Sequence, residues 1–155
     1  MLSSRLHCEA PTLTLLRPFK TFFRISDMLK TKSEMFKNQP KAIFELFARL
    51  VFTSRDRDHT QQYFQLRDLF ANNPPYLSGT LATQGIGIAI DAAACELILP
   101  KYRNAKCYCR CRMVPDETAV GNWTLEALEI RATDWKKICE AAEAVGNESV
   151  LGYSG

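Results

Sequence analysis

The residues most suggestive of chemistry in this 155-residue chain are three cysteines spaced two apart, in the run Cys-Tyr-Cys-Arg-Cys at 107–111. A zinc site would need about four ligands converging on one point. Strand residues two apart lie about 6.6 Å apart along one face, so a strand would splay these thiols. The two histidines, His7 and His59, have no ligand spacing to the run. We therefore expect no metal and no cofactor, with the cysteines filling a core face.

The opposite face of the same extended segment carries a basic strip. Because successive strand residues point to opposite faces, this strip consists of Lys106, Tyr108, Arg110 and Arg112. Sheets that bind single-stranded nucleic acid combine cations with aromatic rings that stack on bases. Glu126 and Glu129, on the next predicted strand, favour cross-strand charge pairing instead. A self-neutralised sheet face and a nucleic-acid contact are the two interpretations.

The chain offers no recognisable catalytic set. A serine or cysteine nucleophile needs a histidine base and a group that orients it. His7 lies in a basic segment, and His59 lies beside an expected helix start. Gly85 and Gly87 lack the third glycine and the Lys-Ser/Thr pair of a phosphate loop. We expect a protein that is not an enzyme.

Positive charge is concentrated near the N-terminus. The formal net charge of +3 is too mild to require a nucleic-acid or membrane partner. The first 26 residues are basic and rich in hydroxyl, Leu and Phe side chains, which is typical of an organelle-targeting presequence, although Pro11 and Pro18 interrupt its helix. A basic, partly ordered arm is the alternative. We expect a basic, aromatic N-terminal arm over 1–34 and a single domain over 35–155.

Large apolar residues and arginines are mixed on and near this arm. That composition is typical of protein interfaces, and burial in the core is the alternative for the apolar members. The candidate interface residues are Arg17, Phe19, Phe22, Phe23, Arg24 and Phe36.

Spacing and capping residues predict the elements of the domain. Pro40 in a first turn, followed by apolar residues at helical spacing, predicts a helix to about residue 53. A second helix is predicted over 60–70, with Tyr63 among its packing residues. The segment 86–99 is ambiguous, and we favour a strand for its second half.

The later elements have clearer patterns. Alternation predicts strands over 106–114 and 123–130, and a phase change in the second predicts a bulge near Ala127. Thr133 or Asp134 caps a last helix that Gly146 closes. Runs of helices and strands favour an α+β fold, with N-terminal helices packed on a small antiparallel sheet of about three strands and a C-terminal helix. No segment has the roughly 18 apolar residues of a membrane span.

The layout of 63–130 adds a family resemblance. Its features are Asn73-Pro74 after an expected helix, Glu-Leu-Ile-Leu-Pro at 96–100, and Gly-Asn-Trp-Thr-Leu-Glu-Ala-Leu at 121–128. In these it resembles the small domain shared by a mitochondrial import-translocase subunit and a cytochrome oxidase assembly factor. The resemblance implies a non-enzymatic domain docked on inner-membrane machinery. A membrane-spanning helix should precede that domain, and only 42–52 stands in its place.

Our first hypothesis from the sequence is a non-enzymatic structural or assembly subunit of a larger protein complex. We expect it at the mitochondrial inner membrane, otherwise in the cytoplasm, with protein partners and no span of its own. The alternative is a nucleic-acid-binding, ribosome-associated protein that uses the basic strip. A second alternative is a small-ligand pocket between the helices and a curved sheet.

Overall fold

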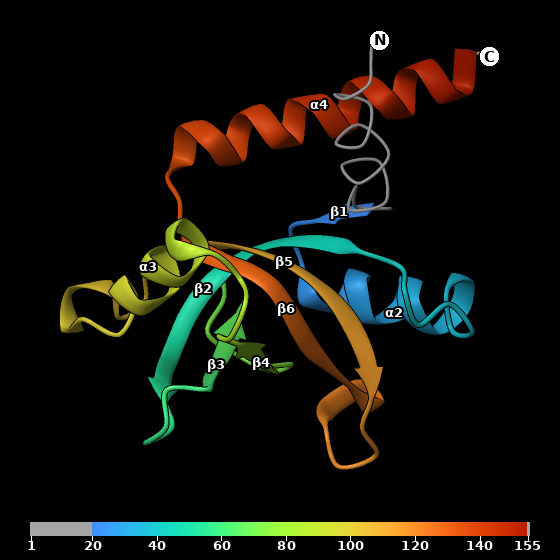
Figure 1. The fold of residues 1–155 in the computed structure, drawn as a ribbon. Coiled ribbons are helices and arrows are strands. Elements are labelled where there is room, and N and C mark those ends of the chain that lie inside the picture. Colours follow the sequence, from blue (N-terminus) through green and yellow to red (C-terminus); the bar gives the residue numbers. More distant parts are fainter. Residues whose placement is uncertain (1–19, 155) are drawn as a thin grey trace, which may run out of the picture.

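The structure is a computed structural model that describes residues 20–154, with side chains over 20–146. The described part contains six strands and three α-helices (Figure 1). In chain order they are β1 (Lys20–Phe22), α2 (Ile25–Met35), β2 (Phe44–Arg55), β3 (Gln61–Arg67), β4 (Leu77–Ala82), α3 (Ile88–Glu96), β5 (Lys106–Pro115), β6 (Trp123–Ala132) and α4 (Trp135–Ser154).

Five of the strands close into a barrel. Their order is β2-β3-β4-β6-β5, and β5 pairs back to β2. All neighbours are antiparallel except β4 and β6, which are parallel, and α3 lies between β4 and β5 in the chain. This is the five-stranded barrel topology of an OB-fold. The short β1 adds to β2 in parallel.

Strand β2 closes the barrel by pairing with two partners. Its first half pairs with β5 and its second half with β3. The register to β3 shifts at Val51, since Leu50 pairs with Leu66 but Phe52 pairs with Gln65. Such a bulge bends and twists a strand, which lets β2 turn from one partner to the other.

Side chains fill the barrel interior. Cys107, Cys109 and Cys111 are fully buried there, and burial raises the pKa of the Cys107 thiol. Opposite them the chain needs a glycine, because a Cβ on Gly79 would lie 2.5 Å from the Phe64 ring. The interior around Phe64 is therefore closely packed by side chains.

Helices cover the two sides of the barrel, with α3 on one side, α2 on the other and α4 running across the top (Figure 1). On the α2 side, Lys32 is only 1% exposed. Its Nζ donates to the carbonyl oxygens of Phe36 (2.9 Å) and Gln39 (3.0 Å) and lies 4.9 Å from the centre of the Trp123 ring. The buried charge is thus satisfied by carbonyl oxygens and an aromatic face.

The predicted fold class is wrong. The helices predicted up to residue 53 and over 60–70 are the strands β2 and β3, and the sheet is a closed barrel rather than a small three-stranded sheet under N-terminal helices. The first half of β2 is buried on both faces, with Phe44 and Leu46 inside the barrel and Phe47 buried outside it. A continuous apolar run carries no strand period, so spacing alone could not separate the two structures.

Several predictions for the later elements are confirmed. The alternating strand and its inward cysteines are confirmed in β5. The predicted bulge is confirmed in β6, where Arg110 pairs with Glu129 but Cys111 pairs with Ala127. Asp134 accepts the backbone N–H of Lys137 at 2.9 Å and so caps α4.

The predicted end of the last helix is wrong, since α4 continues past Gly146. The strand favoured for the second half of 86–99 is also wrong, because this part is the end of α3 followed by turns. Residues 20–34 of the predicted arm contain β1 and all but the last residue of α2. Among the described helices, none has both the length and the apolar character needed to cross a bilayer.

Burial in the barrel determines which thiols we expect to react with an alkylating reagent. Cys95 and Cys139 are exposed, whereas the three cysteines of β5 are buried. Only a thiolate attacks an alkylating reagent, so we expect iodoacetamide to modify Cys95 and Cys139 in the native protein. The β5 cysteines should react only in denaturant. Peptide mapping by mass spectrometry checks this, and fast native labelling at Cys109 would contradict the inward orientation of these thiols.

Candidate nucleic-acid interface

The basic strip on β5 is engaged by the chain itself. Arg110 lies 3.6 Å from Glu129, and Arg112 lies 3.7 Å from Glu126. Tyr108 is only 7% exposed, and its hydroxyl donates to Glu45. Burial, followed by this hydrogen bond, raises the pKa of Tyr108. Tyr108 therefore presents little ring surface for a base to stack on.

The apolar residues proposed for a protein interface also contact the barrel. Phe22 is buried with its ring centre 6.0 Å from that of Phe44, and Phe36 meets Phe44 edge-on at 5.5 Å. Phe23 stacks on Phe47 at 5.3 Å. Arg24 is exposed just before α2, while Arg17 and Phe19 lie outside the described residues. The phenyl rings thus pack against this chain.

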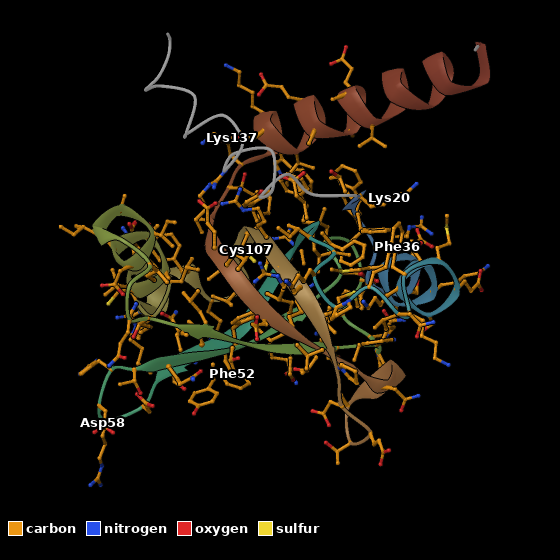
Figure 2. The ribbon with its side chains drawn as sticks, turned by 45° about the vertical axis from the view of Figure 1, so that its right-hand side comes forward. Lys20, Phe36, Phe52, Asp58, Cys107 and Lys137 are labelled. Atoms are coloured by element: carbon orange, nitrogen blue, oxygen red, sulfur yellow. The ribbon has the colours of Figure 1, made fainter. Side chains whose placement is uncertain are left out.

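A different surface carries accessible aromatic rings. It is the outer side of β3, β4 and the second half of β2, where Phe52 is 53% exposed and Tyr63 is 43% exposed. Figure 2 shows Phe52 projecting from the outside of the sheet. Gln65 pairs with Phe52 and Tyr63 pairs with Ser54, so the two rings are diagonal cross-strand neighbours. Such neighbours have Cα atoms about 7–8 Å apart.

Small polar side chains complete this surface. Ser78 pairs with Gln65, and Thr80 pairs with Tyr63, all on the outer side of their strands. We refer to Phe52, Tyr63, Gln65, Ser78 and Thr80 as the aromatic platform. It combines two apolar ring faces with amide and hydroxyl groups that donate and accept hydrogen bonds.

A shallow groove borders the platform at Phe52. It has a volume of about 140 Å³ and lies between β2 and the turn over 97–103. Leu99, Pro100 and Arg103 line it together with Phe52. The ring of Phe52 is therefore accessible both from the sheet face and from this groove.

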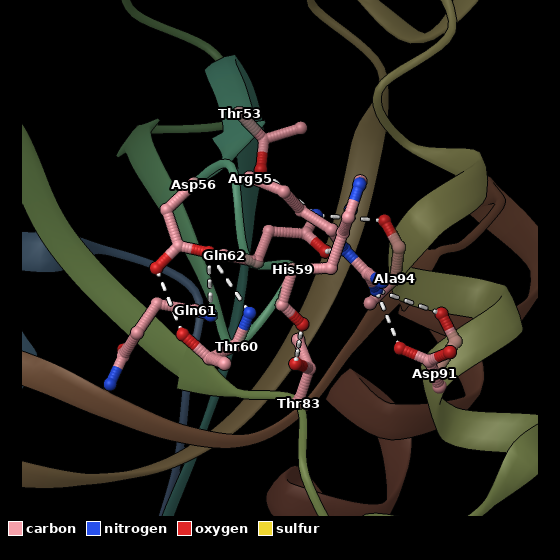
Figure 3. Close-up of polar contacts among 10 residues, drawn as sticks. All are labelled: Thr53, Arg55, Asp56, His59, Thr60, Gln61, Gln62, Thr83, Asp91 and Ala94. Atoms are coloured by element: carbon pink, nitrogen blue, oxygen red, sulfur yellow. Dashed lines mark hydrogen bonds and ion pairs between the residues drawn. The ribbon is translucent and has the colours of Figure 1, made fainter.

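Beside the platform, a buried polar network joins β2, β3 and α3 (Figure 3). Arg55 forms an ion pair with Asp91 at 2.7 Å and donates to Gln62 Oε1 at 2.9 Å. Gln62, which is fully buried, donates to Thr53 Oγ1 (2.9 Å) and to the carbonyl oxygen of Ala94 (2.8 Å). The network satisfies these buried groups and holds α3 against the barrel.

The turn between β2 and β3 is held by one carboxylate. Asp56 accepts the backbone N–H of Thr60 at 2.9 Å and its hydroxyl at 3.0 Å (Figure 3). Partial burial opposes ionisation, but the hydrogen bonds from Thr60 outweigh it and hold the pKa of Asp56 below its usual value. His59 in this turn has φ of 55°. The turn thus forms a fixed border to the platform.

Sequence reasoning missed the platform. Both Phe52 and Tyr63 fell in predicted helices, where Tyr63 was counted as a packing residue. The available signal was the two-residue alternation of 61–67, in which Gln62, Phe64 and Leu66 are buried. Among the described residues, no group of three or more His, Cys, Asp or Glu side chains is placed to hold a metal ion.

Comparisons with known proteins give structural likeness only. No family model and no curated protein matches the chain. Similar solved structures include asparaginyl-tRNA synthetase from Pyrococcus horikoshii, with 13% identity, a TM-score of 0.47 and coverage of 64% of this chain. The chain spans 21% of that synthetase.

In two further structures, one chain is matched over most of its own length. A replication protein A heterotrimer bound to single-stranded DNA has 10% identity and a TM-score of 0.45, covering 70% of this chain and 73% of the other. Yeast Stn1 and Ten1 have 12% identity and a TM-score of 0.49, covering 84% and 90%. A shared fold hosts many functions, and at these scores the likeness carries no functional argument for this chain.

The first functional hypothesis, a structural or assembly subunit of a mitochondrial complex, is corrected. The chain folds as a closed five-stranded barrel of OB-fold topology, an architecture that can bind oligonucleotides, and this agrees better with the nucleic-acid alternative. The phenyl rings that were to contact partner subunits also pack on the barrel. The resemblance to the import-translocase and oxidase-assembly family is tested by none of these comparisons and stays a prediction, as does the mitochondrial location.

The polar network predicts a specific loss of stability. Gln62→Leu removes two donated hydrogen bonds and the one that Gln62 accepts, which leaves the buried Arg55 Nε without its partner. We expect the free energy of unfolding to fall by about 1–3 kcal/mol, measured by urea denaturation. Gln61→Leu, at the adjacent half-exposed position, is the matched control and should change it by less than about 0.5 kcal/mol. Equal effects of the two changes would contradict the role of the network.

Proposed function

We propose that this protein binds single-stranded nucleic acid on the aromatic platform. The observation that supports this most directly is the pair of exposed rings, Phe52 and Tyr63, on adjacent strands of a closed barrel. Unpaired bases stack on such rings, and each stack is worth about 1–3 kcal/mol. In OB-folds that bind oligonucleotides, the face of the second and third barrel strands is used, and these are β3 and β4 here.

The polar members of the platform suit a flexible, unpaired strand. Hydroxyl and amide groups beside a stacked base can bond to its Watson–Crick edge or to the sugar. Gln65, Ser78 and Thr80 offer both donors and acceptors without fixing one base pattern. Binding should therefore tolerate many sequences and favour single strands over duplex, in which the base faces are already stacked.

The charges around the platform support moderate affinity that depends on salt. Arg57 lies in the bordering turn and is exposed, and Arg103 lines the groove beside Phe52. Cations of this kind neutralise phosphates and release counterions. The net charge of +3 is small, so we expect stacking to supply a large share of the binding energy.

Removing the platform rings tests the proposal. We expect Phe52→Ala and Tyr63→Ala each to weaken binding to a fluorescent single-stranded oligonucleotide by about 1–3 kcal/mol, because each removes one stacking surface. Both side chains are largely exposed, so the variants should fold. Fluorescence anisotropy at two or more salt concentrations measures the affinity.

The control is Val114→Ala, which removes an exposed apolar side chain from β5, away from the platform. It should leave the affinity unchanged. Arg110→Gln and Arg112→Gln should also leave the salt dependence nearly unchanged, because Glu129 and Glu126 already neutralise these arginines. A parent protein that binds neither DNA nor RNA single strands would overturn the proposal, as would platform variants that bind with full affinity.

A further inference from the structure

Three cations lie in a row across the middle of the sheet. Arg49 on β2 pairs with Arg67 on β3 and with Lys106 on β5. Like charges directly opposite one another destabilise a sheet. The ion pairs among the described residues use other cations, such as Arg110 and Arg131. The cation row, Arg67, Arg49 and Lys106, is therefore a place where the chain keeps positive charge without neutralising it.

Both arginines of the row are anchored by backbone oxygens. Arg49 donates from Nε to the carbonyl of Leu69 at 2.7 Å and from Nη1 to that of Asn104 at 2.9 Å. Arg67 donates from Nη1 to the carbonyl of Asp68 at 3.2 Å. These bonds hold the guanidinium groups in place, and no ion pair among the described residues compensates their positive charge. Such preorganised cations suit phosphate oxygens.

An exposed aromatic stack borders the cation row. Lys106 Nζ lies 5.1 Å and the Arg49 guanidinium 5.8 Å from the centre of the Trp135 ring. Phe70 stacks on Trp135 with ring centres 5.4 Å apart and an angle of 17°. Phe70 is nevertheless 81% exposed, and no second described ring stacks on it. Its outer face is thus held in position and open to solvent.

The cation row and the platform lie on one continuous surface. Leu50 points into the barrel, so its neighbour Arg49 points outward, and the bulge at Val51 brings Phe52 to the same outer side. On β3, Arg67 and Tyr63 share that side because they are four positions apart and side chains alternate every second position. The surface therefore runs from the turn at 56–60, over the platform, to the cation row and the start of α4.

We infer that the cation row and the Phe70–Trp135 stack form a second contact site for the strand bound on the platform. The row would neutralise backbone phosphates, and the open face of Phe70 would stack on a base. This inference rests on the proposed function and specifies the path that the bound nucleic-acid strand takes over the surface. The strand runs along the boundary of β2 and β3, crosses to Lys106 at the start of β5, and reaches the first turn of α4.

Two oligonucleotide lengths separate the second site from the platform. OB-folds cover about 4–16 nucleotides, so we use oligo-dT of about 5 and about 15 nucleotides with the full chain. Phe70→Ala should weaken binding of the longer oligonucleotide by about tenfold and leave the shorter one unchanged. Phe52→Ala should weaken both. Because Phe70 is exposed, its removal should not disturb folding, which the thermal transition checks.

A matched pair of lysines tests the phosphate contact. Lys106 and Lys101 each lie about 5 Å from an aromatic ring, at 5.1 Å from Trp135 and 5.2 Å from Tyr102, but Lys101 is outside the cation row. For the longer strand, Lys106→Gln should make the slope of log affinity against log salt concentration less negative by about 0.7, which is the contribution of one phosphate contact. Lys101→Gln should leave it unchanged.

The results distinguish the two proposals. In one outcome, Phe52→Ala weakens binding, while Phe70→Ala and Lys106→Gln change the affinity and its salt dependence no more than Lys101→Gln does at either length. That outcome supports the platform and overturns the second site. If the parent protein binds neither length, both are overturned. Tryptophan emission gives an independent readout, because binding of the longer strand should change it in the parent and not in Trp135→Phe. Binding of a protein at Phe70, with no change for oligo-dT, would also overturn the inference.

Discussion

The structure depends on one strand pairing with two partners. Strand β2 gives its first half to β5 and its second half to β3, and the register shift at Val51 separates the two halves. Without this bend the sheet would have open edges, which expose unpaired backbone groups. Closure removes most of these edges and creates an interior that buried side chains must fill, including the three cysteines of β5 and the ring of Phe64. The closeness of Gly79 to that ring shows how little space remains.

Closure also divides the outer surface into a covered part and a free part. Over the first half of β2, Phe47 and Tyr108 are buried under Phe23 and under Ile138 of α4. Over the second half, beyond the bulge, the rings of Phe52 and Tyr63 stay accessible. The bulge is thus both the device that closes the barrel and the place where the outer face changes from packing surface to candidate binding surface.

The cations of the outer surface fall into two groups. Arg110, Arg112 and Arg131 lie opposite or beside glutamates and form ion pairs at the sheet surface. The Arg112–Glu126 pair is partly exposed, and pairs of that kind add little stability, about 0–1 kcal/mol. All three arginines nevertheless have their charge cancelled by a glutamate. Arg49 and Arg67 are bonded to carbonyl oxygens instead, which orients them without cancelling their charge. Two groups of basic residues of similar composition therefore have different electrostatic character.

The sequence alone determined the elements whose signals are local. Alternation placed β5 and turned its cysteines inward, the phase change near Ala127 located the bulge of β6, and Asp134 marked the start of α4. Each depends on residues a few positions apart. Strands β5 and β6 could therefore be assigned, except for their last one or two residues, before any partner strand was known.

Only the tertiary structure decided the nature of β2, the closure of the sheet and the position of the candidate site. A segment buried on both faces, as β2 is around Phe47, shows an apolar run with no diagnostic period. Its strand pairing is with residues far along the chain, such as Tyr108, and such long-range partners leave no mark on local spacing. For the same reason, the accessible rings were Phe52 and Tyr63 rather than Tyr108, because exposure is set by which elements cover a face and not by residue type.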